Sequence, residues 1–200
     1  MPFLTQEDYD TALEITKRVC HALKQENGIP YKGVMYGGFI ATKDGVKLVE
    51  YNARYGDPEV MNILPQLETS LLDAFKAIID GNLSEVPFKY ANKATVCKYV
   101  VPVGYGVKSE AGYPLEVDEE AIAAAGAKLF YAAVDLREDG LYTGTSRSLG
   151  IIGVGDNLSE AEQRAEAGLR HVKGHVFMRH DIGTPEAVPV SYTHLRAHET

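Results

Sequence analysis

One stretch decides the fold of this 200-residue chain: Glu50-Tyr51-Asn52-Ala53-Arg54-Tyr55-Gly56-Asp57-Pro58-Glu59. It begins as a strand and ends at the start of a helix. Side chains alternate between the two faces of a strand, so Glu50, Asn52 and Arg54 share one face. A carboxylate, an amide and a guanidinium fill an apolar core badly, but they suit a hard cation and the phosphates that it neutralises. By spacing alone, a solvated strand face with a surface ion pair fits equally well.

The residues before this stretch predict a β-hairpin. Two apolar runs, Val34–Thr42 and Val46–Ala53, flank Asp44-Gly45, and Asp-Gly in this position is typical of a type I′ turn. That turn predicts three cross-strand pairs on one face: Phe39 with Glu50, Gly37 with Asn52, and Met35 with Arg54. Gly37 and Gly38 weaken the strand but let a ligand approach the backbone over Asn52, with an ordinary bulge as the alternative.

Capping residues and periodicity predict helices on either side of the hairpin. The first covers residues 5–27, with Thr5 as its N-cap and Gly28 as its stop. Asp57 followed by Pro58 predicts the N-cap and first position of a second helix. A third helix, near Ser70–Asp80, is expected to bury five apolar side chains: Leu71, Leu72, Phe75, Ile78 and Ile79.

The composition changes near residue 82, and residues 82–92 read as a linker. Strands are expected beyond it at Ala94–Val103, Leu129–Leu136, Leu141–Arg147, Leu149–Val154 and His175–Met178. Helices are expected at Asp118–Ala125 and from Ser159, as N-cap, to Lys173. Asp139-Gly140 predicts a second hairpin. The chain is therefore assigned to the α+β class, while residues 189–200 lack periodicity and read as a non-native tail.

The totals exclude several functional classes. A net charge of −8 argues against a protein that coats nucleic acid. The sequence has neither an apolar run long enough to span a membrane nor a signal peptide at its start. Its two cysteines are far apart, which fits a reducing compartment. These features predict a cytoplasmic protein without nucleic-acid or membrane partners.

Several runs resemble the glycinamide ribonucleotide synthetase (phosphoribosylamine–glycine ligase) family of the ATP-grasp superfamily. The resemblance is strongest in Tyr31–Gly38 and Glu50–Glu59, and it continues to Ala187 through three further runs: Ala125–Ala132, Thr143–Leu149 and Arg179–Gly183. There are two departures: Thr145-Ser146 replace a glycine pair, and His180 replaces a lysine. The family's amino-terminal domain and the first part of its ATP-grasp module have no counterpart in this sequence.

The resemblance implies a fold and an activity. Residues 1–86 would be the C-terminal part of an ATP-grasp module, with a helix, a β-hairpin and further helices. Residues 87–188 would form a small mixed α+β C-terminal domain. The implied enzyme joins glycine to 5-phosphoribosylamine through a glycyl phosphate, using ATP and Mg²⁺ or Mn²⁺. Its products are glycinamide ribonucleotide, ADP and phosphate, a step of purine biosynthesis.

The resemblance also assigns roles to individual residues. Glu50 and Asn52 would bind the metal and, with Arg54, the ATP phosphates. Arg54 and Asp57 would be catalytic. Glu59 and Arg147 would contact the substrate, although Arg147 fits an ordinary surface arginine as well.

Two other functions stay open. One is a different ATP-grasp carboxylate–amine ligase, which the Arg-Tyr-Gly-Asp-Pro-Glu continuation disfavours. The other is a non-catalytic phosphate- or nucleotide-binding module from a truncated gene. Because half of the ATP pocket is absent, we expect the isolated chain to be inactive without the amino-terminal half of the enzyme.

Overall fold

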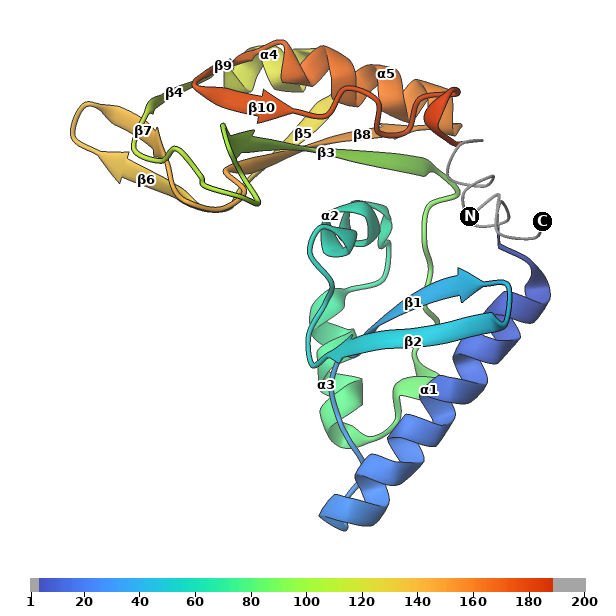
Figure 1. Ribbon diagram of the computed structural model, residues 1–200. Helices are drawn as coiled ribbons and strands as arrows, with labels where there is room; N and C mark the ends of the chain where they lie inside the picture. The colour runs from blue at the N-terminus through green and yellow to red at the C-terminus, as the bar shows by residue number, and fades with distance from the viewer. Residues whose placement is uncertain (1–3, 189–200) are drawn as a thin grey trace. The chain divides into compact units, whose positions relative to one another are not determined.

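The computed structural model describes residues 4–188 (Figure 1). The chain divides into two compact units, each described by itself. Within the described residues, the first unit holds residues 4–57, residues 67–90 and Val188, and the second holds residues 58–66 and 91–187. Helices and antiparallel sheets occur together, so the predicted α+β class is confirmed. The predicted tail at 189–200 lies outside the described residues.

The first unit begins with the long helix α1 (Gln6–Asn27), as predicted. The Thr5 hydroxyl accepts from the Asp8 backbone N–H, and the Asp8 carboxylate accepts from the Thr5 N–H, which completes a capping box. Gly28 ends the helix in the left-handed conformation, at a φ of 73°. These local signals explain why the helix begins and ends where the sequence predicts.

The hairpin of β1 (Tyr36–Thr42) and β2 (Gly45–Asn52) is confirmed, but its predicted turn is wrong. The ladder closes at the pair Thr42–Gly45, so the loop residues are Lys43 and Asp44. In residues 4–188, positive φ angles occur at glycines alone. Asp44 therefore does not take the left-handed conformation that a type I′ turn at Asp44-Gly45 requires.

A bulge between Gly38 and Phe39 makes the predicted register wrong as well. Phe39 pairs with Leu48, but Gly38 pairs with Glu50, so the ladder passes over one residue of β2. A slip of one residue reverses which side chains share a face. Three pairs were predicted on one face. Phe39 does not pair with Glu50, Gly37 does not pair with Asn52, and Met35 precedes β1.

The helix α3 (Leu71–Asp80) forms where it was predicted, followed by the 3₁₀ turn η2 (Leu83–Glu85). The Ser70 hydroxyl caps it by accepting from the Asp73 N–H, and Gly81 ends it. The predicted core face is wrong at three of its five residues, while Leu71 and Ile78 are half-buried. Ala74 and Ala77 are its buried residues, whereas Leu72, Phe75 and Ile79 are exposed.

The second unit contains two four-stranded antiparallel sheets. Their strand orders are β10-β3-β8-β5 and β6-β7-β4-β9. The first sheet is built from β3 (Ala94–Pro102), β5 (Ala127–Tyr131), β8 (Leu149–Gly155) and β10 (Val176–Met178). The second is built from β4 (Pro114–Val117), β6 (Val134–Arg137), β7 (Gly140–Thr143) and β9 (Val172–Gly174).

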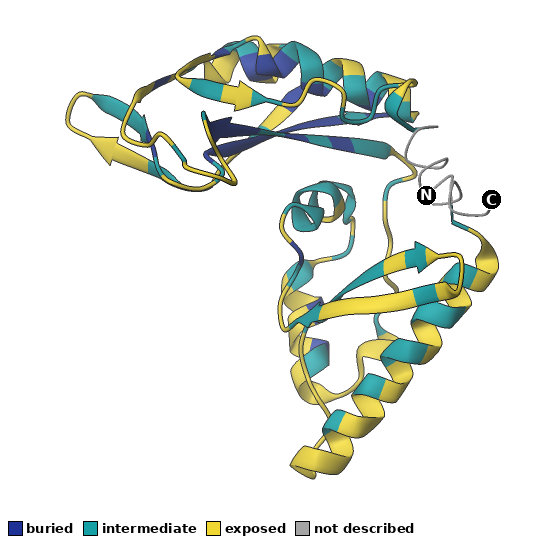
Figure 2. Ribbon diagram, in the orientation of Figure 1, coloured by how far each residue is buried: buried dark blue, intermediate teal, exposed yellow. Residues whose placement is uncertain are grey.

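Helices complete the second unit. They are α2 (Glu59–Ile63) with the 3₁₀ turn η1 (Leu64–Gln66), α4 (Glu119–Ala124) and α5 (Leu158–Leu169). The helix expected at Asp118–Ala125 forms as α4, and Asp118 caps it by accepting from the Ala121 N–H. Figure 2 shows the buried core along β3, β8 and α5, whereas α1 in the first unit has no buried residue.

Close packing of α5 on β8 depends on glycine. A Cβ built on Gly153 would lie 1.8 Å from the Ala161 carbonyl oxygen, and one on Gly155 would lie 2.6 Å from the Ala161 nitrogen. Both distances are far below a van der Waals contact, so side chains at these positions would push the helix off the sheet.

Several predicted boundaries in the second unit are wrong. The expected strand at Leu129–Leu136 is two strands, because β5 and β6 belong to different sheets. Asn157 rather than Ser159 caps α5, which ends at Leu169 and is followed by the unpredicted strand β9. The hairpin expected at Asp139-Gly140 exists, but Arg137 pairs with Gly140, so Glu138 and Asp139 form its loop.

Candidate functional site

The predicted metal ligands lie together at the end of β2. The Asn52 side-chain amide donates a hydrogen bond of 2.8 Å to a Glu50 carboxylate oxygen. The two residues are one strand repeat apart, so the contact confirms that they share a face. Glu50 is exposed and Asn52 half-buried, which leaves the pair open to solvent on this face.

Tyr51 lies between them and holds the opposite face of the hairpin against α1. Its hydroxyl lies 2.6 Å from the Thr16 hydroxyl. Its ring meets Phe39 edge-on, with 6.0 Å between the ring centroids. A Cβ on Gly37 would lie 2.6 Å from the Phe39 ring and 2.8 Å from the Tyr51 ring, so Gly37 belongs to this packed face.

Gly38, not Gly37, is the glycine on the open face. It lies directly opposite Glu50 in the ladder. The atom nearest to a Cβ built there is the Glu50 Cγ, at 3.6 Å, an ordinary van der Waals distance. The predicted clearance over Asn52 is therefore corrected to clearance beside Glu50, because the bulge reverses the face of the two glycines.

Arg54 follows the strand rather than belonging to it. β2 ends at Asn52, so strand alternation does not set the direction of the Arg54 side chain. Its guanidinium donates a bond of 2.7 Å to the Tyr55 carbonyl, while the residue stays exposed. Burial raises the pKa of the Tyr55 phenol, and Tyr90 adds to this shift, so the phenol is neutral at physiological pH.

Asp57 and Glu59 fall in different units. Asp57 is exposed and belongs to the first unit, whereas Glu59 is half-buried as the first residue of α2 in the second. Pro58 occupies the N-cap of α2, so the prediction that Asp57 caps this helix and Pro58 follows at its first position is wrong.

Arg147 lies in the second unit, with its guanidinium carbon 5.0 Å from the centre of the Tyr99 ring. Tyr99 is the cross-strand partner of Gly150. A Cβ on Gly150 would touch the Met61 sulfur of α2, at 2.8 Å. Because directly opposite residues point to the same face of a sheet, α2 and Arg147 lie on one face of the sheet containing β3.

A hollow of about 510 Å³ lies beside the loop that precedes Arg147. Gly144 and Thr145 contribute to its lining, with Asp135 and Arg137 from β6. Thr145 and Ser146, which depart from the family pattern, are exposed. The Arg137 guanidinium stacks on the Tyr142 ring at 3.9 Å, which holds one cationic group at the rim.

A buried ionic cluster in the second unit was not predicted. The Lys98 ammonium is fully buried and donates to Glu162 at 2.6 Å, to Glu166 at 2.8 Å and to the His180 carbonyl at 2.7 Å. A His180 ring nitrogen lies 2.9 Å from the second Glu166 oxygen. One signal was available: a lysine inside an apolar strand, with two glutamates four residues apart on a later helix.

This cluster is structural by its bonding. Three acceptors satisfy the three Lys98 donors. Desolvation raises the pKa of Glu166, but hydrogen bonds from Lys98 and His180 outweigh that effect, and the net pKa is lowered. Glu166 is therefore charged at neutral pH.

The carboxylate oxygens of Glu50 and the amide oxygen of Asn52 are suitable ligands for a divalent cation that phosphates also bind. One carboxylate and one amide are few ligands, but Mg²⁺ keeps several waters and shares phosphate oxygens. Across residues 4–188, no group of three or more His, Cys, Asp or Glu side chains is arranged to hold a metal by itself. The same residues include no helix that is long and apolar enough to cross a membrane.

Two domain models of one family match this sequence. The ATP-grasp (A) domain of phosphoribosylglycinamide synthetase matches residues 1–60, and the C domain matches residues 95–185. The phosphoribosylamine–glycine ligase of Methanobrevibacter smithii is 50% identical over 98% of this chain and 44% of its own length. The ligase of Methanothermobacter thermautotrophicus is 47% identical over the same shares.

A solved structure gives the same result. The crystal structure of phosphoribosylamine–glycine ligase from Thermotoga maritima matches with a TM-score of 0.65 and 25% identity, over 78% of this chain and 38% of that one. The chain thus spans less than half the length of these relatives. Its match to both domain models, to these two relatives and to a solved ligase shows that the chain belongs to the phosphoribosylglycinamide synthetase family.

Proposed function

We propose that this chain is the part of a phosphoribosylamine–glycine ligase that supplies the metal- and phosphate-binding strand of its ATP site. The observation that carries this is the hydrogen-bonded pair of the half-buried Asn52 and the exposed Glu50 on the open face of β2. The pair lies at the start of the run Glu50–Glu59. This run belongs to the segment, residues 1–60, that matches the ATP-grasp domain.

The proposed reaction joins glycine to 5-phosphoribosylamine in purine biosynthesis. The γ-phosphoryl group of ATP passes to the glycine carboxylate, which releases ADP. The amine of phosphoribosylamine then attacks the acyl carbon, so that a C–N bond forms and phosphate leaves. Such a transfer requires mainly positioning and neutralisation of charge.

Glu50 and Asn52 would hold Mg²⁺ or Mn²⁺ through a carboxylate oxygen and the amide oxygen. When bound, the cation supplies charge neutralisation at the phosphates. Gly38 leaves the backbone opposite Glu50 uncovered, which gives a polyphosphate room to approach. The Tyr51–Thr16 contact holds the strand in place from its other face.

The remaining residues have proposed roles toward the substrates. Arg54 would bind the transferring phosphoryl group, because guanidinium donors match phosphate oxygens in pairs. Asp57 and Glu59 would contact the amine-bearing substrate, with Asp57 at the reacting amine. Arg147, whose guanidinium lies over the Tyr99 ring, would bind the ribose phosphate.

We further propose a boundary between domains 1–86 and 87–188, and a cytoplasmic location. The ATP site would be completed by the part of the ligase that this chain does not span. We therefore expect the isolated chain to release no ADP in response to glycine and phosphoribosylamine. Turnover by the purified chain would contradict this expectation. It would mean that the ATP site is complete without the rest of the ligase.

The decisive test uses a chimaeric ligase, in which this chain replaces the matching 44% of the Methanobrevibacter smithii enzyme. Glu50→Gln is expected to lower kcat at least about a hundredfold and to raise the Mg²⁺ concentration needed for activity. Asp44→Asn, in the loop of the same hairpin, is the matched control and should change neither. Equal activity in both variants would remove Glu50 from the metal site.

Two rival functions predict different results in the same assays. Another carboxylate–amine ligase would show ADP release with a carboxylate other than glycine. If the chain is a phosphate- or nucleotide-binding module, the isolated chain would bind Mn²⁺-ADP. Neither the isolated chain nor the chimaeric ligase would then show turnover. The Asn52–Glu50 pair is compatible with both, so the substrate dependence of the chimaeric ligase separates them.

A further inference from the structure

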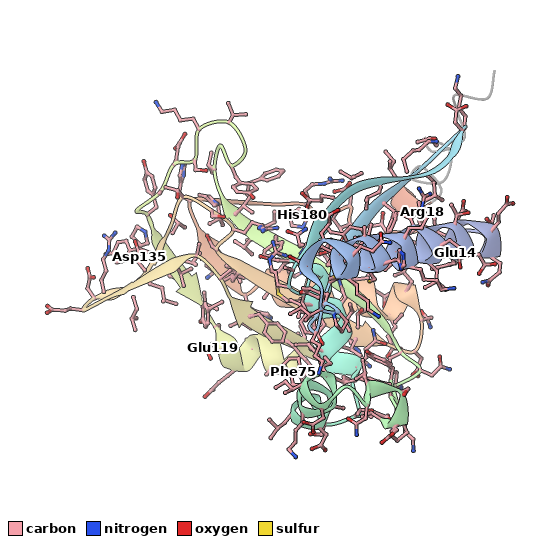
Figure 3. The ribbon with its side chains drawn as sticks, turned by 90° about the horizontal axis from the view of Figure 1, so that it is seen from below. Glu14, Arg18, Phe75, Glu119, Asp135 and His180 are labelled. Carbon is pink, nitrogen blue, oxygen red and sulfur yellow. The ribbon has the colours of Figure 1, made fainter. Side chains whose placement is uncertain are left out.

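The helix α3 carries a row of large apolar side chains that face solvent. Leu72, Phe75 and Ile79 are 74%, 40% and 69% exposed. Their spacing of three and four residues places them along one side of the helix, here called the α3 stripe. Phe75 is labelled in Figure 3, and Figure 2 shows α3 with exposed and buried residues side by side.

The helix α3 differs from a usual amphipathic helix because its most buried residues are small. Its buried residues are the small Ala74 and Ala77, at 2% and 6% exposure. Of its larger apolar residues, Leu71 and Ile78 are half-buried, and the three residues of the stripe are exposed. Burial of large side chains normally supplies most of the stability of a packed helix. The choice of residues on α3 therefore indicates two packed sides, of which this chain covers one.

The α3 stripe is held in a rigid helix. Ser70 caps its first turn, and Gly81 ends it through an N–H bond to the Ala77 carbonyl. The Lys32 ammonium donates to the Ile79 carbonyl at 2.5 Å, which fixes the last turn. Asp73 and Lys76 place charges beside the stripe, and an apolar centre with a polar rim is the usual anatomy of a protein interface.

The rest of the first unit points the same way. Among its described residues, Ala74 and Ala77 are the hydrophobic side chains that reach full burial. Ten further large apolar residues of the unit are exposed: Tyr9, Leu13, Ile29, Tyr31, Ile40, Leu48, Val49, Leu83, Phe88 and Tyr90. A unit of this size with so small a core is stabilised by packing its exposed apolar side chains against another part of a protein.

The lengths of the relatives identify the occupant. The Methanobrevibacter smithii and Methanothermobacter thermautotrophicus ligases each have 44% of their length matched by this chain. More than half of each ligase is therefore available to cover the first unit. We infer that the α3 stripe is a docking surface for the part of the ligase that this chain does not span. This inference rests on the proposed function in one respect, namely that the longer protein to which the chain belongs is a ligase.

The test compares stability in two backgrounds, the isolated chain and the chimaeric ligase. The double variant Leu72→Asp/Ile79→Asp places two charges on the α3 stripe. Leu136→Asp is the matched control, because Leu136 is 82% exposed on β6 in the second unit. Urea unfolding, followed by circular dichroism, gives the unfolding equilibrium constant of each variant.

If the α3 stripe is a docking surface, the double variant raises the unfolding constant of the chimaeric ligase at least about a hundredfold. In the isolated chain, the same variant changes the unfolding constant less than about threefold. The Leu136→Asp control changes the unfolding constant less than about threefold in both the isolated chain and the chimaeric ligase. Small changes in both backgrounds would overturn the inference. Large changes in both would also overturn it, because they would mean that this chain covers the stripe itself.

A second measurement applies if the chimaeric ligase does not fold. Hydroxyl-radical labelling of the intact Methanobrevibacter smithii ligase reports the exposure of the helix aligned with α3. Protection relative to α3 of the isolated chain supports the inference, and equal labelling contradicts it. The lower kcat and higher Mg²⁺ requirement expected of the Glu50→Gln variant test the ATP site separately, so failure of one proposal is distinguishable from failure of the other.

Discussion

The side chains of Asn52 and Glu50 are joined by a hydrogen bond of 2.8 Å on the open face of β2. Because Asn52 donates through its amide nitrogen, its amide oxygen is the atom that would face a cation. Replacing Asn52 by Leu removes that oxygen while keeping a similar volume. We expect Mn²⁺ affinity of the chimaeric ligase with ADP, measured by electron paramagnetic resonance, to fall at least about tenfold.

The same substitution should leave the fold almost unchanged. Both partners lie at the solvent-exposed face, where the loss of one hydrogen bond costs about 0.5–1 kcal/mol or less. A larger loss in urea unfolding would mean that Asn52 acts mainly through structure. Unchanged Mn²⁺ affinity would contradict a metal role for this residue.

Tyr51→Phe tests how the strand is held from its other face. The change removes the hydroxyl that lies 2.6 Å from Thr16 but keeps the ring that meets Phe39. We expect a loss of about 1 kcal/mol in the free energy of unfolding. Thr16→Val should cost a similar amount, and the double variant should cost less than the sum, because both changes break the same bond.

Lys98→Met tests the buried ionic cluster of the second unit. Lys98 is fully buried, while the side chains of Glu162 and Glu166 are 13% and 25% exposed. Removing the ammonium leaves two carboxylates close together without their cation, and we expect a loss of about 3–5 kcal/mol. The free energy of unfolding in urea measures the effect.

A triple variant supplies the control for that substitution. Lys98→Met combined with Glu162→Leu and Glu166→Leu removes every charge that Lys98 pairs with by its side chain. Apolar replacement of a complete buried ion group is often neutral or stabilising. The triple variant should therefore be more stable than Lys98→Met alone, and equal stability would show that packing rather than charge causes the loss.

The pH dependence of stability follows from two lowered pKa values. Hydrogen bonds from Lys98 and His180 outweigh desolvation and lower the pKa of Glu166, and the bond from Arg179 lowers the pKa of Asp181. A lowered folded-state pKa gives stability that is present above the unfolded value and lost as pH falls through the folded value. The melting temperature should therefore fall as pH drops below about 4.

Glu166→Gln isolates this contribution. The variant should be less stable than the natural chain at pH 7, and the difference should shrink toward low pH because the natural carboxylate is then protonated. Glu120→Gln, on the exposed side of α4, is the control and should follow the natural curve. A difference that stays constant from pH 7 to low pH would contradict the assignment.

Two glycine substitutions should behave in opposite ways. Gly153→Ala places a Cβ 1.8 Å from the Ala161 carbonyl oxygen, so α5 must move off β8, and we expect a loss of about 3 kcal/mol or more. Gly38→Ala meets its nearest atom at 3.6 Å and should be tolerated by the fold. Urea unfolding of the two variants compares them directly, and similar losses would contradict the close approach of α5.

Gly38→Ala has a second use. A methyl group on the open face beside Glu50 would narrow the space proposed for a polyphosphate. We expect the KM of the chimaeric ligase for ATP to rise about fivefold or more with little change in stability. An unchanged KM would show that the ligand does not approach the backbone at Gly38.

Much of the local structure could be predicted because its causes are local. Thr5 and Asp8 form a capping box within one turn, and Gly28 ends α1 by its left-handed conformation. The helix expected at Asp118–Ala125 forms as α4, with Asp118 as its N-cap. Glu50 and Asn52 share a face because alternation is a property of any strand, and the structure adds the bond between them.

Other features were beyond prediction because they depend on distant residues. The bulge at Gly38 reverses the face of the two glycines, and it arises from the way that β1 pairs with β2. The short strand β9 forms because β4 offers it a ladder. Lys98 meets its glutamates only when α5 packs on β3, across more than sixty positions of sequence.

The sequence by itself determined the ends of α1, the presence of both hairpins, the polar face of β2 and the resemblance to one family. Each depends on neighbours within a few residues or on the order of side chains in this chain's own motif. The tertiary structure alone decided which glycine faces the open side, which side of α3 is buried and where the charge of Lys98 is balanced. These depend on packing between segments, and packing is set by the whole chain rather than by local preference.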